Sequence, residues 1–325
     1  MRIARCLAIA VAFGVAAPVG QASAQQPVTF ATAAPGSIYN SAGSAIAKLV
    51  SSETDLKTTV QAFGGSSQYQ APVNAGELEF GLANVFEVSL AIPGKQIFEG
   101  KPHPNLRAVA VLFPLRNALF VRKDSPINSV AELKGKRGPT GFTSQKILVP
   151  VVNSVLGTAG LTLDDVQGVN VANIVANADA FAAGRTDFFA FALGAGKVKE
   201  VDAAVGGVKV VPIPNTPEAL AGLRKHIPVA YLRAEKPSPA ATGVIEPTYQ
   251  VAYDAVLFAS TKTPDDVVRK VVEAMHKNGK ELRAATGPLR LYDEKRMSAD
   301  IPGVQFHPAA VEYYKKNGLW PAKGS

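Results

Sequence analysis

Four turns rich in glycine and hydroxyl side chains each follow a strand-like run and precede a helix-like run. They are residues 34–39 (APGSIY), 63–67 (FGGSS), 138–144 (GPTGFTS) and 193–196 (LGAG). The first turn of a helix presents N–H groups without acceptors and a partial positive charge, and small residues let a ligand approach them. Such turns at the ends of strands line the crevice of α/β proteins. Together they predict a cleft that accepts an anion, although any one alone is more simply an N-cap.

Motifs for enzymatic chemistry are not found in the sequence. The histidines (His103, His226, His276 and His307) have no second His or Cys at metal-ligand spacing. Residues 194–197 (GAGK) lack the first glycine and the Ser/Thr of a phosphate-binding loop, and no G-x-S-x-G pattern occurs. We therefore predict a protein that is not an enzyme and has no metal or other cofactor. A secreted enzyme on the same fold would need a nucleophile–base pair or a metal cluster.

The turns require strands and helices that position them, and the hydrophobic pattern supplies both. Runs at 28–32, 58–63 and 80–83 read as strands, and 39–51 and 66–75 have helical spacing. This β-α-β-α-β order is typical of α/β architecture.

A second cycle of the same kind starts after the apolar runs 106–113 and 118–122, which suit strands near a domain crossing. The run 248–259, after this cycle, reads as a further long strand. We predict an α/β fold of two lobes, joined by crossing hinge strands, with a ligand cleft between them. The expected division is a discontinuous lobe 1 of residues 25–120 and 235–325, and a lobe 2 of residues 121–234.

Composition and charge narrow the possible partners. The chain has 325 residues, 47 % hydrophobic and 18 % charged, with a formal net charge of +8. These values exclude a mostly disordered or collagen-like protein. The one tight basic cluster, Lys134, Lys136 and Arg137, has no aromatic residues interleaved. We therefore exclude nucleic acid as a partner. The scattered positive charge gives the protein at most a weak, non-specific attraction for small anions.

Residues 1–24 have the features of a secretory signal peptide. The segment begins with two arginines, continues with the apolar run 6–17 (CLAIAVAFGVAA) and ends with the small-residue cleavage pattern 22–24 (ASA). The apolar run is too short to span a bilayer. Cleavage removes Cys6, the only cysteine, so we predict a periplasmic mature protein without disulfide bonds.

The order of further motifs along the chain is that of a known receptor group. The segments are 32–50 (TAAPGSIYNSAGSAIAKLV), 63–66 (FGGS), 74–81 (NAGELEFG), 106–122, 130–137 (VAELKGKR), 184–189 (GRTDFF), 306–310 (FHPAA) and 313–320 (YYKKNGLW). In this order they resemble the TAXI group, the extracytoplasmic solute receptors of tripartite ATP-independent periplasmic (TRAP) transporters. The resemblance covers almost the whole mature chain.

This resemblance implies a type II periplasmic-binding-protein fold. Its lobes would close on a small anionic solute, a carboxylate or an amino acid, and deliver it to the membrane subunits of a TRAP permease. We expect a monomer. A receptor for an ABC-type importer on the same fold is the alternative. The turns and the resemblance together predict ten ligand-binding residues: Ser37, Ile38, Tyr39, Ser66, Asn84, Arg116, Phe142, Thr143, Ser144 and Gly194.

Departures from the group's pattern bear on the solute. Ser37 replaces a glycine, Phe142 stands where a serine is usual, and Gln145 stands where an arginine is common. The missing arginine argues against a dicarboxylate or an amino acid. Arg116 is a candidate replacement, because a guanidinium can grip a carboxylate with two hydrogen bonds; a surface arginine is the equal alternative. The Tyr39 ring could form an apolar wall of the cleft against the solute. The alternative is that it packs within its own lobe.

Overall fold

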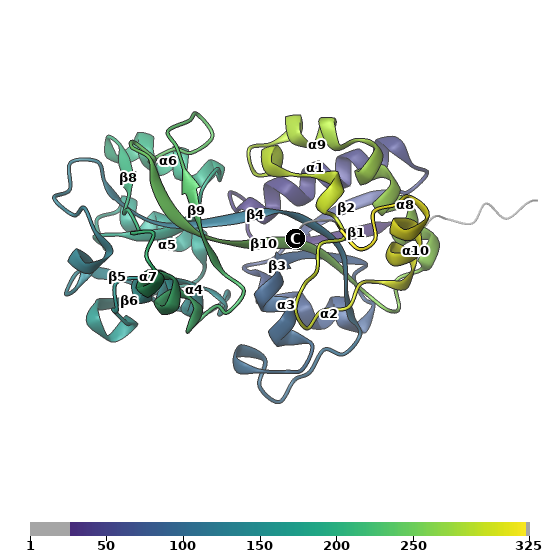
Figure 1. Ribbon diagram of the computed structural model, residues 1–325, viewed down its shortest axis with the longest axis horizontal. Helices are drawn as coiled ribbons and strands as arrows, with labels where there is room; N and C mark the ends of the chain where they lie inside the picture. Colours follow the sequence, from purple (N-terminus) through teal and green to yellow (C-terminus); the bar gives the residue numbers. More distant parts are fainter. Residues whose placement is uncertain (1–26, 323–325) are drawn as a thin grey trace, which may run out of the picture.

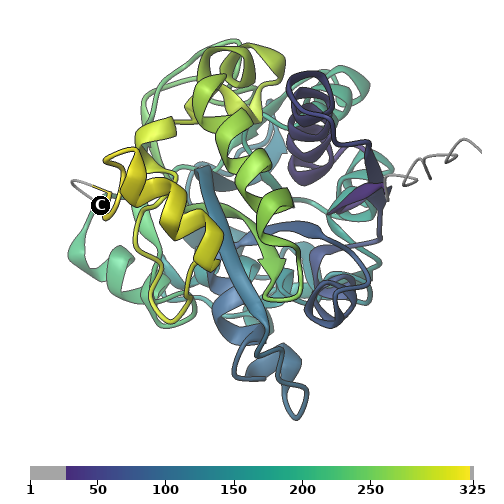
Figure 2. The same cartoon turned by 90° about the vertical axis from the view of Figure 1, so that its right-hand side faces the viewer.

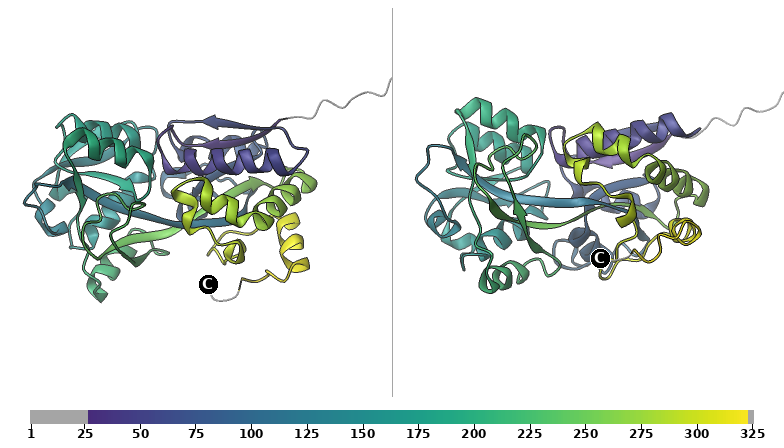
Figure 3. Two further views of the ribbon diagram at one scale, coloured as in Figure 1. Left: turned by 90° about the horizontal axis from the view of Figure 1, so that it is seen from above. Right: turned by 45° about the horizontal axis from the view of Figure 1, so that its top comes forward.

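Two long strands connect the halves of the molecule. The computed structural model describes residues 27–322, so the predicted signal peptide 1–24 and Cys6 lie outside the described residues. Strands β4 (Leu106–Arg122) and β10 (Thr248–Ser260) run antiparallel to each other, and Tyr253 pairs with Leu115 near the middle. Both strands extend from one lobe into the other (Figure 1). Two more views at one scale show the same connection (Figure 3).

Lobe 1 is built on parallel strands that begin at the N-terminal end of the described chain. Strands β1 (Val28–Thr32), β2 (Thr58–Ala62) and β3 (Phe80–Asn84) follow the order β2-β1-β3, after which β10 and β4 continue the sheet. Its longer helices are α1 (Ile38–Glu53), α2 (Gln70–Ala75), α3 (Val85–Ala91), α8 (Asp265–Lys277), α9 (Gly279–Ala285) and α10 (Pro308–Lys316). Figure 2 shows this lobe end-on, with α8 between α1 and α10.

Lobe 2 uses the other ends of the same crossing strands. The far end of β4 pairs with β7 (Phe189–Ala192) and β8 (Val208–Val210), and the first half of β10 pairs with β9 (Tyr231–Glu235). A separate parallel pair is formed by β5 (Arg137–Phe142) and β6 (Gln167–Val171). The helices are α4 (Leu148–Gly157), α5 (Ile174–Ala182), α6 (Gly196–Val205) and α7 (Pro217–Arg224).

The predicted α/β fold of two lobes joined by crossing strands is confirmed, with local differences. The apolar runs 106–113 and 118–122 are one continuous strand, in which Pro114 pairs with Asp254 and the ladder to β10 shifts its register at Leu112. Helix α5 begins at Ile174, where Asn173 caps it by accepting the amides of Val175 and Ala176.

Each lobe has its own buried aromatic pair. Phe30 stacks on Phe80 in lobe 1 at a centroid distance of 5.0 Å, and Phe120 stacks on Phe189 in lobe 2 at 4.9 Å. Large apolar side chains of this kind dominate the free energy of burial. Both pairs belong to one continuous set of buried apolar side chains that extends through the two lobes.

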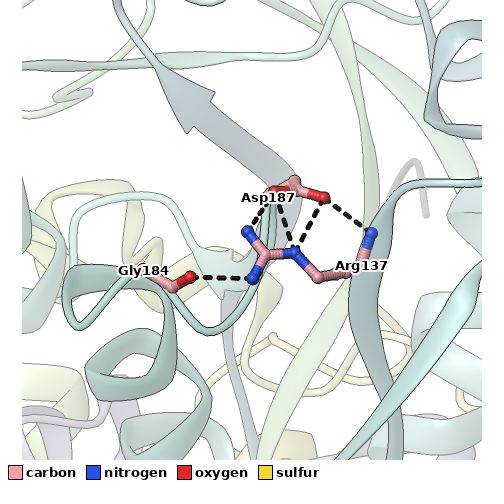
Figure 4. A network of polar contacts seen from close by, with 3 residues as sticks. All are labelled: Arg137, Gly184 and Asp187. Atoms are coloured by element: carbon pink, nitrogen blue, oxygen red, sulfur yellow. Dashed lines mark hydrogen bonds and ion pairs between the residues drawn. The ribbon is translucent and has the colours of Figure 1, made fainter.

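The basic turn at residues 134–137 has internal partners. Arg137 donates to both carboxylate oxygens of Asp187 and to the carbonyl oxygen of Gly184, and its backbone amide also donates to Asp187 (Figure 4). The Arg137 guanidinium lowers the pKa of the Asp187 carboxyl. Lys134 lies 3.3 Å from Asp165. These pairs tie β5 to the segment before β7 and use two of the three cations of the turn.

Candidate ligand-binding site

A small cavity lies between the two lobes, against the crossing strands. Its volume is about 40 Å³. Lobe 1 and the crossing strands contribute Ser37, Ile38, Tyr39, Asn84, Leu115, Asn117 and Tyr253, and lobe 2 contributes Gln145, Ile147, Leu148, Val151, Ile174, Phe191 and Ala192. Pockets that enclose drug-sized ligands measure roughly 300–1,000 Å³. The cleft is therefore narrow in this structure, and a solute must move its walls apart to enter.

The N-terminus of α1 opens onto this cavity. The Ser37 hydroxyl caps the helix by accepting the amide of Asn40, and the helical ladder begins where the Ser41 amide donates to the Ser37 carbonyl oxygen. The amides of Ile38 and Tyr39 precede that ladder and so have no intrahelical acceptor. Gly36 adopts a φ of +86° in the turn before the cap, a conformation that glycine takes without strain. The turn thus points two N–H groups and a partial positive charge at the cavity.

Asn84 ends β3 and connects the cavity to a buried carboxyl group. Its side-chain oxygen accepts the amide of Glu87 at 2.7 Å, which caps α3. The Glu87 carboxylate accepts the hydroxyls of Ser66 at 2.6 Å and Ser67 at 2.7 Å. Burial raises the pKa of Glu87 to about 7, and the two hydroxyl bonds oppose that rise. Glu87 is fully buried and has no cationic partner among the residues that the structure describes.

Two buried phenols near Glu87 line the cavity. Tyr39 and Tyr253 are 5 % and 1 % exposed, and both line the cavity. Burial raises the pKa of each phenol far above its usual range, so both hydroxyls keep their protons. The side chain of Asn84 lies beside the Tyr39 hydroxyl and that of Asn117 beside the Tyr253 hydroxyl. We call Tyr39, Asn84, Asn117 and Tyr253 the cleft cluster.

The lobe 2 wall is mostly apolar. Leu148 and Val151 lie on α4, Ile174 begins α5, and Phe191 lies on β7. The polar exception is Gln145, whose side-chain oxygen accepts the Ile174 amide at 3.2 Å. This bond caps α5 and leaves the Gln145 side-chain N–H group available to a ligand.

Glycines let the lobes touch around the cavity. A Cβ atom placed on Gly65 would lie 2.5 Å from the Cβ of Gln145 and 2.7 Å from the carbonyl oxygen of Ser144, both in the opposite lobe. A Cβ on Gly287 of lobe 1 would lie 3.0 Å from the carbonyl oxygen of Gly194 in lobe 2. The structure thus brings the predicted turn 63–67 against the turn that follows β5, in a closed arrangement.

Four of the ten predicted ligand-binding residues meet at the cavity: Ser37, Ile38, Tyr39 and Asn84. The other six are not brought to its lining. The Ser66 hydroxyl bonds to Glu87, Phe142 is buried in lobe 2, and Gly194 contacts the hinge. The amides of Thr143 and Ser144 donate to the carbonyl oxygens of Val171 and Ala172, which continues the β5–β6 pairing.

Arg116 is buried in the hinge, and its guanidinium is already paired. One nitrogen donates to Glu235 at 2.9 Å and another to the carbonyl oxygen of Leu193 at 3.3 Å. The Arg116 and Glu235 side chains are 9 % and 8 % exposed, and Arg233 lies 3.3 Å from the second Glu235 oxygen. The surface position weighed above therefore does not occur. We call Arg116, Glu235 and Arg233 the hinge cluster.

The remaining polar residues of the lining were missed by reasoning from the sequence. Asn117 lies between two predicted apolar runs and Tyr253 within a third, where the one available signal is a polar group in an otherwise apolar segment. Gln145 was noted only as a departure from the TAXI pattern. The structure adds these three because the crossing strands and the turn after β5 pack against the end of α1.

Membrane-spanning and metal-binding features are not observed between residues 27 and 322. None of the helices in this part of the chain is both long and apolar enough to cross a bilayer. No group of three or more His, Cys, Asp or Glu side chains within it is placed to hold a metal ion.

Comparison with known proteins gives one family and several similar folds. Residues 30–318 match the model of the NMT1-like family. A structure described as that of a periplasmic transporter is 17 % identical, with a TM-score of 0.56 over 82 % of this chain and 88 % of the other. PhnD1 from Prochlorococcus marinus (MIT 9301), in complex with methylphosphonate, is 12 % identical, with a TM-score of 0.53 over 90 % and 96 %. At these identities the likeness shows the two-lobe fold alone.

Proposed function

This chain belongs to the NMT1-like family, and we propose that it is a periplasmic solute-binding receptor whose lobes close on a small organic anion. The observation that carries the proposal is the cavity between the lobes, lined from both sides and surrounded by close lobe-to-lobe contacts. A solute that touches both walls holds the lobes together, because its contacts exist only in the closed form.

The proposed contact residues are the predicted residues that line the cavity, together with the three polar lining residues that only the structure revealed. Ser37, Ile38 and Tyr39 present the end of α1, and Asn84, Asn117, Gln145 and Tyr253 present neutral side chains. An oxygen-rich head fits this donor set. We keep the lobe division at residues 25–120 with 235–325 and 121–234, and the mature N-terminus after residue 24, as part of the proposal.

The proposed partner is the membrane permease of a TRAP transporter. The order of TAXI-like motifs along the chain supports this choice over an ABC-type importer, which is the alternative for the same fold. Uptake into vesicles that contain the membrane subunits separates the two partners. An ion gradient should drive uptake through a TRAP permease, whereas ATP is required by an ABC importer.

Ligand-dependent stabilisation tests the receptor function itself. The mature chain, unfolded and refolded to release any carried solute, should unfold at a higher temperature with one member of a panel of carboxylates, amino acids, sulfonates and phosphonates. X-ray scattering should show a smaller radius for the bound protein. If no member shifts the transition of solute-free protein, and mass spectrometry finds no small molecule on the protein as first purified, the receptor function is wrong.

A further inference from the structure

The two walls of the cleft differ in chemistry, and this difference points to a class of solute. The lobe 1 wall carries polar groups at Ser37, Tyr39 and Asn84. The lobe 2 wall is apolar at Leu148, Val151 and Phe191, which are 7 %, 2 % and 2 % exposed, and its one polar side chain, Gln145, is neutral. A solute that spans the cleft therefore needs one polar end and one apolar end.

Charged side chains do not line this cavity in the described part of the chain. The arginine nearest the hinge, Arg116, is held by Glu235, and Lys197 near Gly36 is paired with Asp179 at 2.8 Å and Glu200 at 3.1 Å. A carboxylate in the cleft would therefore be held by neutral donors and by the end of α1. That arrangement suits a single negative charge, because the end of a helix supplies only about half a positive charge.

A second charge on the solute has no partner. Placed against the lobe 2 wall, a further carboxylate or an ammonium group would lose its hydration without gaining an ion pair, which is strongly unfavourable. The buried carboxyl group of Glu87 does not line the cavity, and both of its oxygens accept serine hydroxyls. It is not presented to an ammonium group in the cavity.

We propose that the solute is a compact monocarboxylic acid with a short, uncharged, apolar chain. Its carboxylate would accept the amides of Ile38 and Tyr39 at the end of α1, and its chain would pack on Leu148, Val151 and Phe191. The small volume of the closed cavity, about 40 Å³, favours a chain of few carbon atoms. This assignment rests on the proposed receptor function and narrows it.

Calorimetric titration with four matched compounds tests the assignment. They are 3-methylbutanoate, its neutral amide, leucine (which adds an ammonium group) and glutarate (which adds a second carboxylate). We expect 3-methylbutanoate to bind at least about tenfold more tightly than each of the other three, a difference of about 1.4 kcal/mol. Tighter binding of leucine or glutarate would overturn the assignment and leave the receptor function standing.

Three further outcomes are also decisive. Tighter binding of the amide would show that the site prefers a neutral head and would overturn the monocarboxylate. If none of the four binds while another compound of the larger panel does, the assignment fails and the receptor function holds. If nothing binds in either experiment, both fail.

A pair of isosteric variants locates the apolar end of the solute. Val151→Thr puts a hydroxyl in the lobe 2 wall and should weaken 3-methylbutanoate binding by roughly fivefold, since the hydroxyl then faces an apolar chain. Val60→Thr makes the same change on β2, where Val60 is 38 % exposed, and should leave the affinity unchanged. Equal affinities for Val151→Thr and Val60→Thr would contradict the placement of the chain on this wall.

Discussion

Two buried polar clusters in this molecule lie close together along the crossing strands, and they use their polar groups in different ways. In the hinge cluster, Arg116 and Glu235 neutralise each other at 2.9 Å, and Arg116 also bonds to a backbone carbonyl. In the cleft cluster, Asn117 and Tyr253 carry no charge and line the cavity. The hinge cluster pairs opposite charges with each other, although the Arg233 Nε and the second Glu235 oxygen make no hydrogen bond, whereas the cleft cluster is neutral and lines the space between the lobes.

This difference shows that the formal charge of a buried side chain is a poor predictor of whether that side chain contacts the solute. A buried charge must be paired within the protein, since an unpaired one is very unfavourable, and a paired guanidinium is no longer free for a ligand. Amides and phenols can be buried at a lower free-energy cost and stay available. The assignment of Arg116 to the ligand was based on charge, and the structure places the neutral Asn117 at the cavity instead.

The largest effect is expected from breaking the hinge cluster. Arg116→Met leaves the Glu235 carboxylate buried without its main partner, and the free energy of unfolding should fall by about 3–5 kcal/mol. Urea denaturation measures this loss. The affinity of the remaining folded protein should change little, because Arg116 does not line the cavity.

A double variant checks the cause of that loss. Arg116→Met combined with Glu235→Leu removes both charges and should recover most of the stability. If Arg116→Met keeps full stability and weakens solute binding at least about tenfold, the distinction between the two clusters fails and Arg116 contacts the solute.

The next effect is a dependence of stability on pH that comes from Glu87. Its carboxyl has no cation beside it, unlike that of Glu235, and burial raises its pKa from 4.5 to about 7. The folded state therefore holds this proton more tightly than the unfolded chain does. The contribution to stability is full below pH 4.5 and is lost as the pH rises through about 7, by about 3 kcal/mol in total.

Glu87→Gln isolates this contribution. The variant should lose that part of the pH dependence between pH 5 and 8 in urea denaturation, while the other titrating groups affect both proteins equally. The groups that face Glu87 are Ser66, Ser67, Tyr39, Tyr69 and Tyr253, and none of them titrates in this range. Parallel stability curves for the two proteins would contradict the prediction.

A third change acts on the closure of the cleft rather than on either cluster. Gly65→Ala adds a Cβ that would lie 2.5 Å from the Gln145 Cβ in the closed form, so the lobes must stay farther apart. The Gly65 φ of −173° is extended and suits alanine, so the folded lobe is not strained. We expect solute affinity to fall at least about tenfold, with a larger radius in X-ray scattering.

Gly196→Ala is the matched control for this closure test. A Cβ on Gly196 meets no atom within 4 Å, and the residue begins α6. Its affinity and radius should equal those of the parent. Equal affinities for the Gly65 and Gly196 variants would show that closure does not bring Gly65 against Gln145.

The smallest effect is expected from removing the hydroxyl of one of two buried tyrosines near Glu87. Tyr253→Phe removes a hydroxyl beside the cavity and should weaken binding by roughly threefold to tenfold with little loss of stability. Tyr69→Phe removes a hydroxyl that donates to the Leu82 carbonyl oxygen and should lower stability by about 1 kcal/mol without changing affinity. The same effect on affinity from both variants would remove Tyr253 from the site.

Much of the fold is predictable because its signals are local. The strands at 28–32 and 248–260 follow from runs of β-branched and aromatic residues, and the start of α1 follows from a serine cap after a glycine turn. For the same reason Ser37, Ile38, Tyr39 and Asn84 could be placed at the site, since each lies at a strand end or helix start. Pro114 separates the two predicted runs, yet β4 continues through it in register with Asp254.

The sequence by itself determined the α/β class, the turns that end the strands, and the donors at the start of α1. These depend on neighbours a few residues away. Only the tertiary structure decided that Asn117, Gln145 and Tyr253 line the cavity while Arg116 is withdrawn into the hinge. Arg116 pairs with Glu235, which lies 119 residues later in the chain. This pairing depends on how two distant strands pack, and the residues around Arg116 in the sequence do not indicate it.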